Sequence, residues 1–132
     1  MNKAALIFAA IFLATGMGCT KKSGDEIKIG VFGPFTGGSA PMGVSMRNGV
    51  QIAMDQINAS GGVLGKKLVM VDRDDEAKNE RGGQIMQELL DKEQVVAVLG
   101  PINTGVANAS SRYANERKVP MIINVSAGEI GR

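Results

Sequence analysis

Short apolar runs with strand character alternate with segments of helical periodicity along this chain, and that alternation restricts the fold more than any other feature. The predicted strands are Ile27–Phe32, Leu68–Val71, Val95–Leu99 and Met121–Val125. The predicted helices are Val44–Ile57, Ala77–Lys92 and Gly105–Arg117. A single helix between successive strands implies right-handed crossover connections and strands that run parallel. The pattern therefore predicts an α/β fold built on a parallel sheet.

Two of these helices carry apolar residues at helical spacing, and we expect both stripes to belong to the core and not to a cofactor site. In the first helix they are Met46, Val50, Ala53, Met54 and Ile57. In the second they are Ile85, Met86, Leu89 and Leu90. The strand Val95–Leu99 is apolar throughout, which is typical of a strand covered on both faces.

The composition excludes several classes of function. The 132 residues allow one domain at most. The 15 lysines and arginines nearly balance the 13 aspartates and glutamates, whereas a nucleic-acid surface needs a clear basic excess. Histidine, the commonest general base and metal ligand, is absent from the sequence. We therefore predict no enzymatic activity, no cofactor, no bound metal and no nucleic-acid partner.

The loop Gly33–Ser39 joins the first predicted strand to the first helix and invites comparison with nucleotide-binding loops. It lacks the G-x-G-x-x-G spacing that lets a backbone approach a pyrophosphate, and Ser39 stands where a P-loop needs lysine. We interpret it as a flexible loop at the rim of a cleft.

An acidic run, Asp72–Glu76, follows the second predicted strand. A calcium-binding loop of the EF-hand type would need glycine at the position of Ala77 and glutamate at its twelfth position, and the chain has neither. We interpret the run as a solvated strand end whose charges favour the start of the next helix.

The first residues have the character of a targeting segment. Lys3 precedes the unbroken apolar run Ala4–Ala14. That run is too short to span a bilayer, but it fits the hydrophobic region of a secretory signal peptide. We assign residues 1–18 to the signal peptide.

The only cysteine of the chain, Cys19, comes directly after this leader. Small residues before it resemble a bacterial lipoprotein processing site, although Gly16 replaces the usual branched aliphatic residue. Residues 19–25 would then form a lipidated tether, and their polar composition suits that role. The alternative is ordinary signal cleavage near Gly18, which would leave a free thiol by chance.

A glycine-rich turn lies within the segment Asp55–Leu68, between a helical run and a β-branched run. Together with the opening strand Ile27–Pro34, this segment resembles the amino-terminal lobe of type I periplasmic solute-binding proteins, in particular the branched-chain amino-acid (leucine/isoleucine/valine) binding proteins of ABC transporters. The resemblance extends from Glu26 to Ile130. It implies a doubly wound parallel sheet with strand order 2-1-3-4, in which residues 26–132 form an incomplete amino-terminal lobe.

Ligands of open α/β sheets bind beyond the carboxyl ends of the strands. The loops predicted to lie there are Gly33–Gly43, Gly100–Gly105 and Val125–Glu129. At Asn103 and Thr104 a loop opens a helix, so free backbone N–H groups, the positive end of the helix dipole and a hydroxyl can together hold a carboxylate. The alternative is that Asn103 or Thr104 only caps the helix. Ser126 offers a further hydroxyl, and its alternative role is a simple turn.

The resemblance assigns roles to some of these positions. In branched-chain amino-acid binding proteins, the segment that matches Asn103 and Thr104 donates hydrogen bonds to the α-carboxylate of the ligand. The position of Val125 supplies a backbone carbonyl that accepts from the α-amino group.

Three positions depart from the pattern of that family. Ala127 stands where a second hydroxyl is expected, and Ser126 lies one residue earlier. Met42 stands where an aromatic side chain often lines the pocket, and methionine makes a softer apolar wall. The identity of the ligand therefore does not carry over from the family. The predicted ligand-binding residues are Met42, Asn103, Thr104, Val125, Ser126 and Ala127.

The predicted function is non-catalytic capture of an amino acid or related small carboxylate for an ABC permease. The protein would act in the periplasm or on the cell-surface side of the membrane, anchored by lipid at Cys19. The alternative is a ligand-sensing receptor lobe that signals and transports nothing. Because a two-lobed binding protein needs two domain-sized halves, we expect a truncated chain that supplies half a pocket and leaves a strand edge or helix face uncovered.

Overall fold

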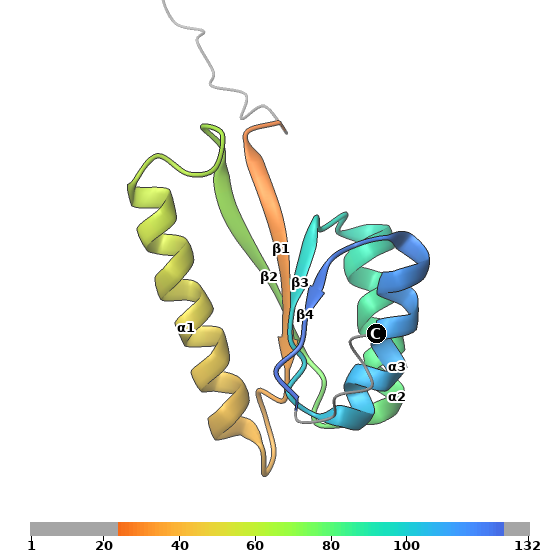
Figure 1. Ribbon diagram of the computed structural model, residues 1–132. Coiled ribbons are helices and arrows are strands. Elements are labelled where there is room, and N and C mark those ends of the chain that lie inside the picture. Colours follow the sequence, from red (N-terminus) through yellow and green to blue (C-terminus); the bar gives the residue numbers. More distant parts are fainter. Residues whose placement is uncertain (1–23, 126–132) are drawn as a thin grey trace, which may run out of the picture.

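Four parallel strands form the central sheet of the domain, in the order β2-β1-β3-β4 (Figure 1). The structure is a computed structural model that describes residues 24–125. The strands are β1 (Glu26–Gly33), β2 (Lys67–Asp74), β3 (Ala97–Leu99) and β4 (Met121–Ile122). Helix α1 (Ala40–Ala59) covers one face of the sheet, and helices α2 (Asn79–Gln87) and α3 (Thr104–Arg117) cover the other. The predicted doubly wound α/β sheet and its strand order are confirmed.

Strand β1 is the central element because it pairs with two neighbours. Its whole length is in register with β2, from Glu26 opposite Lys67 to Gly33 opposite Asp74. On its other side it pairs with β3, where Val31 lies opposite Leu99. Val31 itself is fully buried, as expected of a strand that has neighbours on both sides and helices on both faces.

Two helices begin at different residues from those predicted. Helix α1 starts at Ala40, before the predicted Val44, and its first turn contains proline, where the missing N–H group costs no helical hydrogen bond. Helix α2 starts only at Asn79, because Glu76 and Ala77 adopt positive φ angles of 52° and 56° that a right-handed helix excludes. Its last turn widens into the π-helical segment η1 (Glu88–Lys92).

Two strands are shorter than predicted. Strand β3 begins at Ala97 and not at Val95, and β4 ends at Ile122 and not at Val125. Beyond β4 the N–H group of Asn124 donates to the carbonyl oxygen of Pro101 at 3.2 Å, so this backbone is held by a loop contact and not by the ladder. Apolar character alone does not reveal where a neighbouring strand stops pairing.

The main core lies between the sheet and helices α2 and α3. Its largest buried side chains include Phe32, Met86, Leu89, Val98 and Val106. The stripe predicted for the second helix is confirmed, since Ile85, Met86 and Leu89 are buried and Leu90 packs against the cluster.

The opposite face of the sheet is covered less completely, because α1 packs mainly against β1 and β2 (Figure 1). Met54 is buried there, but Ala53 and Ile57 of the predicted stripe are exposed, so that part of the prediction is wrong. Ile122 on the edge strand β4 is 68% exposed. Val96 is also exposed, in contrast to the prediction of a strand covered on both faces. Among the described residues, the apolar side chain of Ile122 on edge strand β4 thus lies in solvent.

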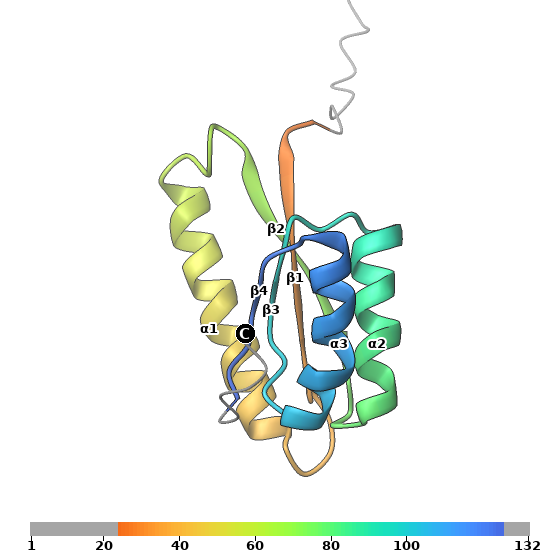
Figure 2. The same ribbon diagram turned by 45° about the vertical axis from the view of Figure 1, so that its right-hand side comes forward.

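Small residues allow α2 and α3 to approach each other closely (Figure 2). A Cβ atom added at Gly82 would lie 2.6 Å from the carbonyl oxygen of Val106, which is far inside van der Waals contact. Next to this contact, the buried Ser110 hydroxyl donates to the same Val106 oxygen at 2.9 Å and so needs no partner outside its own helix.

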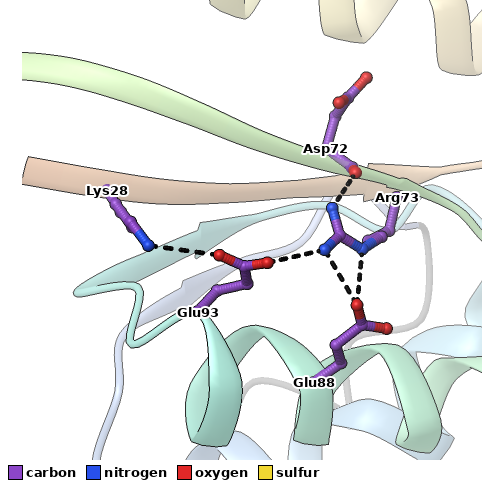
Figure 3. A network of polar contacts seen from close by, with 5 residues as sticks. All are labelled: Lys28, Asp72, Arg73, Glu88 and Glu93. Atoms are coloured by element: carbon purple, nitrogen blue, oxygen red, sulfur yellow. Dashed lines mark hydrogen bonds and ion pairs between the residues drawn. The ribbon is translucent and has the colours of Figure 1, made fainter.

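A network of ion pairs joins the sheet to the end of α2 and to η1 (Figure 3). Arg73 of β2 donates to Glu88 at 2.9 Å and to Glu93 at 3.0 Å, and Lys28 of β1 donates to Glu93 at 3.3 Å. The hydrogen bond from Lys28 lowers the pKa of Glu93. These side chains are roughly a third exposed, so we regard the network as orienting η1 more than as a large source of stability.

Glycine substitutions test the close packing of α2 on α3. Gly82→Ala is expected to lower the free energy of unfolding by about 1–3 kcal/mol, because its methyl group meets the Val106 carbonyl. Gly49→Ala, inside α1 with no atom within 4 Å of the added Cβ, is the matched control and is expected to raise it by about 0.5–1 kcal/mol. Urea unfolding followed by circular dichroism measures both. Equal effects of the two substitutions would contradict the packing argument.

Candidate functional site

The carboxyl ends of β1, β3 and β4 meet at one edge of the sheet, shown at the bottom of Figure 1. The loops that follow these strands lead into α1 and α3, so the first turns of both helices border this edge, where open α/β sheets have their ligand-binding crevice. The hollow lined by Glu26, Ile27, Lys28, Lys66, Glu93, Gln94 and Val96 lies at the other end of the strands and does not belong to the crevice.

Two glycines form the base of the crevice by letting neighbouring elements come close. A Cβ atom at Gly100 would lie 2.0 Å from the carbonyl oxygen of Phe32, and its φ of +103° also favours glycine. The Met46 methyl group of α1 reaches this point, 3.3 Å from the Cβ position at Gly100 and 3.1 Å from that at Gly33. Met46 therefore packs beneath the ends of β1 and β3, in line with the prediction that it belongs to the core.

Met42 lies in the first turn of α1 and is 61% exposed. Its backbone N–H group donates to Ser39 at 3.2 Å, so the helix fixes the backbone and leaves the side chain in solvent. The structure thus places an exposed, adaptable apolar side chain at the edge where the sequence predicted one wall of the pocket.

Asn103 and Thr104 lie where the sequence placed them, at the start of α3. Asn103 occupies the N-cap position with an extended backbone, but its side chain makes no capping hydrogen bond. Its carbonyl oxygen accepts from Ala107 at 2.9 Å, whereas its buried side-chain oxygen has no partner. Thr104 is exposed. The capping alternative is therefore not observed for Asn103. In general the first N–H groups of a helix have no partner within the helix and can bind an anion.

The third predicted loop is described only at its beginning. Val125 is half-buried, and the preceding Asn124 holds it next to Pro101 through the 3.2 Å backbone hydrogen bond. Val125 is thus brought to the same edge as the start of α3. Ser126 and Ala127 lie outside the described residues, as does Cys19.

The acidic run after the second predicted strand differs from its interpretation as a solvated strand end. Asp72 and Asp74 belong to β2, because β1 pairs with that strand as far as Gly33. Successive side chains of a strand point to opposite faces, so Asp72 and Asp74 face α1 while Arg73 and Asp75 face α2. The contacts follow this rule: Asp72 pairs with Arg47 of α1 at 3.2 Å, whereas Arg73 pairs with η1. The run is an ordered junction between layers.

Asp74 and Asp75 are the functional candidates that the sequence analysis missed. Asp74 accepts hydrogen bonds from the loop between β1 and α1. Burial raises the pKa of Asp74, but the hydrogen bonds from Thr36 and the backbone outweigh it and hold the pKa below its usual value. Asp75 is fully buried; burial raises its pKa, and one carboxylate oxygen has no partner. A predicted strand that extended to Asp74 would have placed Asp72 and Asp74 on one face and Arg73 and Asp75 on the other, and so indicated these roles.

Within residues 24–125, no group of three or more acidic, histidine or cysteine side chains is placed to hold a metal ion. In the same part of the chain, no helix combines the length and apolar character needed to cross a membrane.

Known proteins are similar to this chain in sequence and in fold. Residues 26–131 match the family described as periplasmic binding protein. The chain is 35% identical over 97 residues to the Leu/Ile/Val-binding protein BraC3 of Rhizobium johnstonii, a match that covers 74% of this chain and 26% of that protein. The chain thus spans about a quarter of the length of this curated relative.

Two solved structures are similar as well. The substrate-binding protein LivJ from Streptococcus pneumoniae, in complex with isoleucine, superposes with a TM-score of 0.76 at 31% identity, over 80% of this chain and 30% of that one. A solute-binding protein of an ABC transporter from Rhodopseudomonas palustris, in complex with 3,4-dihydroxybenzoic acid, superposes with a TM-score of 0.74 at 29% identity. This match covers 80% of the present chain and 29% of that one.

The opposite pKa shifts of the two neighbouring carboxyl groups predict opposite effects of pH on stability. Between the usual value of 3.8 and its raised folded value, Asp75 binds more protons in the folded state, so its contribution to stability falls as pH rises. Asp74 has a lowered pKa, so its contribution is present above 3.8 and is lost as pH falls through its folded value.

Urea unfolding of the wild type, Asp75→Asn and Asp74→Asn across pH 3 to 7 measures these contributions as differences. Relative to Asp75→Asn, the wild type is expected to lose stability as pH rises, and relative to Asp74→Asn it is expected to lose stability as pH falls. The same sign for both differences would show that the two carboxyl groups share one environment, contrary to the structure.

Proposed function

The chain belongs to the periplasmic binding protein family, and we propose that its domain captures a small carboxylate solute, an amino acid or a related acid, for an ABC importer. The family consists of binding proteins, in agreement with the prediction of a non-catalytic role.

One observation carries this proposal: α3 begins at the crevice without a side-chain cap. Asn103 makes no capping hydrogen bond, and Thr104, the first residue of α3, is exposed. An anion at this position would gain several donors and the positive end of the helix dipole at once. A solute carboxylate fits this chemistry better than a neutral or cationic group.

The ligands of the two similar structures support a carboxylate as the common element. One is described with isoleucine and the other with 3,4-dihydroxybenzoic acid. Both molecules carry a carboxyl group, whereas their remaining parts share little. In our proposal the start of α3 holds that shared group, the Val125 carbonyl accepts from an amino group where one is present, and Met42 adapts to the apolar part.

The described domain supplies one wall of such a site. We infer that the solute lies between this wall and a second lobe, and that closure of the two lobes follows from tighter binding in the closed state. Ser126 and Ala127, which follow Val125 in the sequence, are proposed to contribute to the same site.

We further propose that the protein acts outside the cytoplasmic membrane, anchored by lipid at Cys19, where it delivers solute to its permease. This location is supported by the order of features at the start of the chain, where an apolar leader is followed by a cysteine and then by polar residues. Strand β1 begins at Glu26, and we propose residues 19–25 as the tether that precedes it.

Solute binding is tested by isothermal titration of the gene product, purified from its native host, with L-isoleucine, other amino acids and 3,4-dihydroxybenzoate. Thr104→Val is expected to raise the Kd by about tenfold, because it removes one hydrogen bond to a charged group. Ser111→Ala, which removes a hydroxyl bonded within the same helix, is the matched control and is expected to leave the Kd unchanged. The amides of the same acids are expected not to bind. Equal binding of acid and amide would refute carboxylate recognition.

Lipid anchoring is tested by fractionation and mass spectrometry. The wild type is expected in the membrane fraction with a mass above that of the chain from Cys19 onward. Cys19→Ser is expected to move the protein to the aqueous fraction, since the thiol proposed to carry the lipid is removed. An unmodified thiol in the wild type would support cleavage near Gly18 instead.

A further inference from the structure

The carboxylate of Asp74 ties the loop between β1 and α1 to the end of β2. Its Oδ1 atom accepts from the backbone N–H groups of Phe35 at 2.8 Å and Glu76 at 2.9 Å. Its Oδ2 atom accepts from the Thr36 hydroxyl at 2.6 Å. In two of these bonds, helix α1 lies between the donor and Asp74 in the sequence. They therefore join segments that are close only in the folded domain.

The tip of that loop has little packing of its own. Gly37 adopts a φ of +78°, and a Cβ atom added there or at Gly38 would have no neighbour within 4 Å. Thr36 is exposed as well. A glycine-containing tip without packed side chains gains its order from hydrogen bonds, and the bonds from Phe35 and Thr36 both end on Asp74.

A second and weaker contact holds the same loop. The Arg47 guanidinium lies 4.9 Å from the centroid of the Phe35 ring and pairs with Asp72 at 3.2 Å. Both members of this ion pair are more than a third exposed, so it contributes little by itself. Asp72 and Asp74 thus act on one loop from the same face of β2, which provides a matched pair for comparison.

The position of the loop determines where one wall of the crevice stands. Helix α1 follows it directly and carries Met42 in its first turn. The first turn of α1 also packs directly on the backbone of the loop, because a Cβ atom at Gly43 would lie 2.1 Å from the carbonyl oxygen of Pro34. A loop released from Asp74 would therefore move the start of α1, across the crevice from the start of α3.

We propose that Asp74 is a positioning residue for solute capture, because its carboxylate holds the loop between β1 and α1, and with it the start of α1, in a binding-ready arrangement. The inference rests on the proposed solute-binding function and adds a residue that need not touch the solute. Preorganisation of this kind raises affinity because the loop loses its conformational entropy on folding and not on ligand binding.

The chemistry of the contact distinguishes two substitutions. In Asp74→Asn the Oδ1 atom can still accept from Phe35 and Glu76, and the amide can donate to the Thr36 hydroxyl, which rotates to accept. In Asp74→Ala all three bonds are lost. The asparagine variant is therefore expected to rescue most of what the alanine variant loses.

The test is isothermal titration of the full gene product with the acids that the wild type binds. Asp74→Ala is expected to raise the Kd by about tenfold, with Asp74→Asn within about threefold of the wild type. Thr36→Val, which removes one bond and is the variant of choice if Asp74→Ala does not fold, is expected to lie between them. Asp72→Ala removes the neighbouring carboxylate on the same face, and its Kd is expected to stay within about twofold of the wild type.

The outcomes separate this inference from the function it rests on. A wild type that binds none of the acids overturns the proposed function itself. A wild type that binds, together with Asp74→Ala and Thr36→Val variants that bind equally well, overturns the positioning role alone. Equal losses in Asp72→Ala and Asp74→Ala would also overturn it, because they would indicate a general effect of charge at the strand end.

Discussion

The pairing of β1 with both of its neighbours organises everything else in this domain. Because β2 and β3 run parallel to β1, their carboxyl ends gather at one edge, and the loops after them are forced together there. The register is continuous from Glu26 to Gly33 on the β2 side, so Asp74 arrives opposite the last residue of β1. A shift of that register by one residue would turn Asp74 toward α2 and release the loop that it holds.

Alternation along β2 divides its charges between two layers. Arg73 joins the sheet to η1 through Glu88 and Glu93 (Figure 3). Asp72 pairs with Arg47 of α1, and Asp74 binds the loop before that helix. A strand at the edge of a sheet can carry such side chains because part of its surface remains in contact with water. The same strand thus orients the helical layers on both faces.

The two faces of the sheet differ in completeness. On one face α2 and α3 pack closely through Gly82 and enclose a continuous core. On the other face α1 covers the β1–β2 half, and Ile122 of β4 stays exposed. The proposed solute site lies at the strand ends, with the start of α1 on one side and the start of α3 on the other (Figure 2).

The sequence by itself determined the elements, their order and the start of α3 at Asn103 and Thr104. Apolar periodicity and glycine turns are local properties, so they locate strands, helices and the loop at Asn103 and Thr104 without knowledge of the fold. Burial of Asp75 and the contacts of Asp74 depend on which strand lies next to β2 and how far the pairing runs. Exposure of Ile57 and Val96 depends on how much of each face the helices cover. Only the tertiary structure decided these features, because they arise from contacts between segments that are distant along the chain.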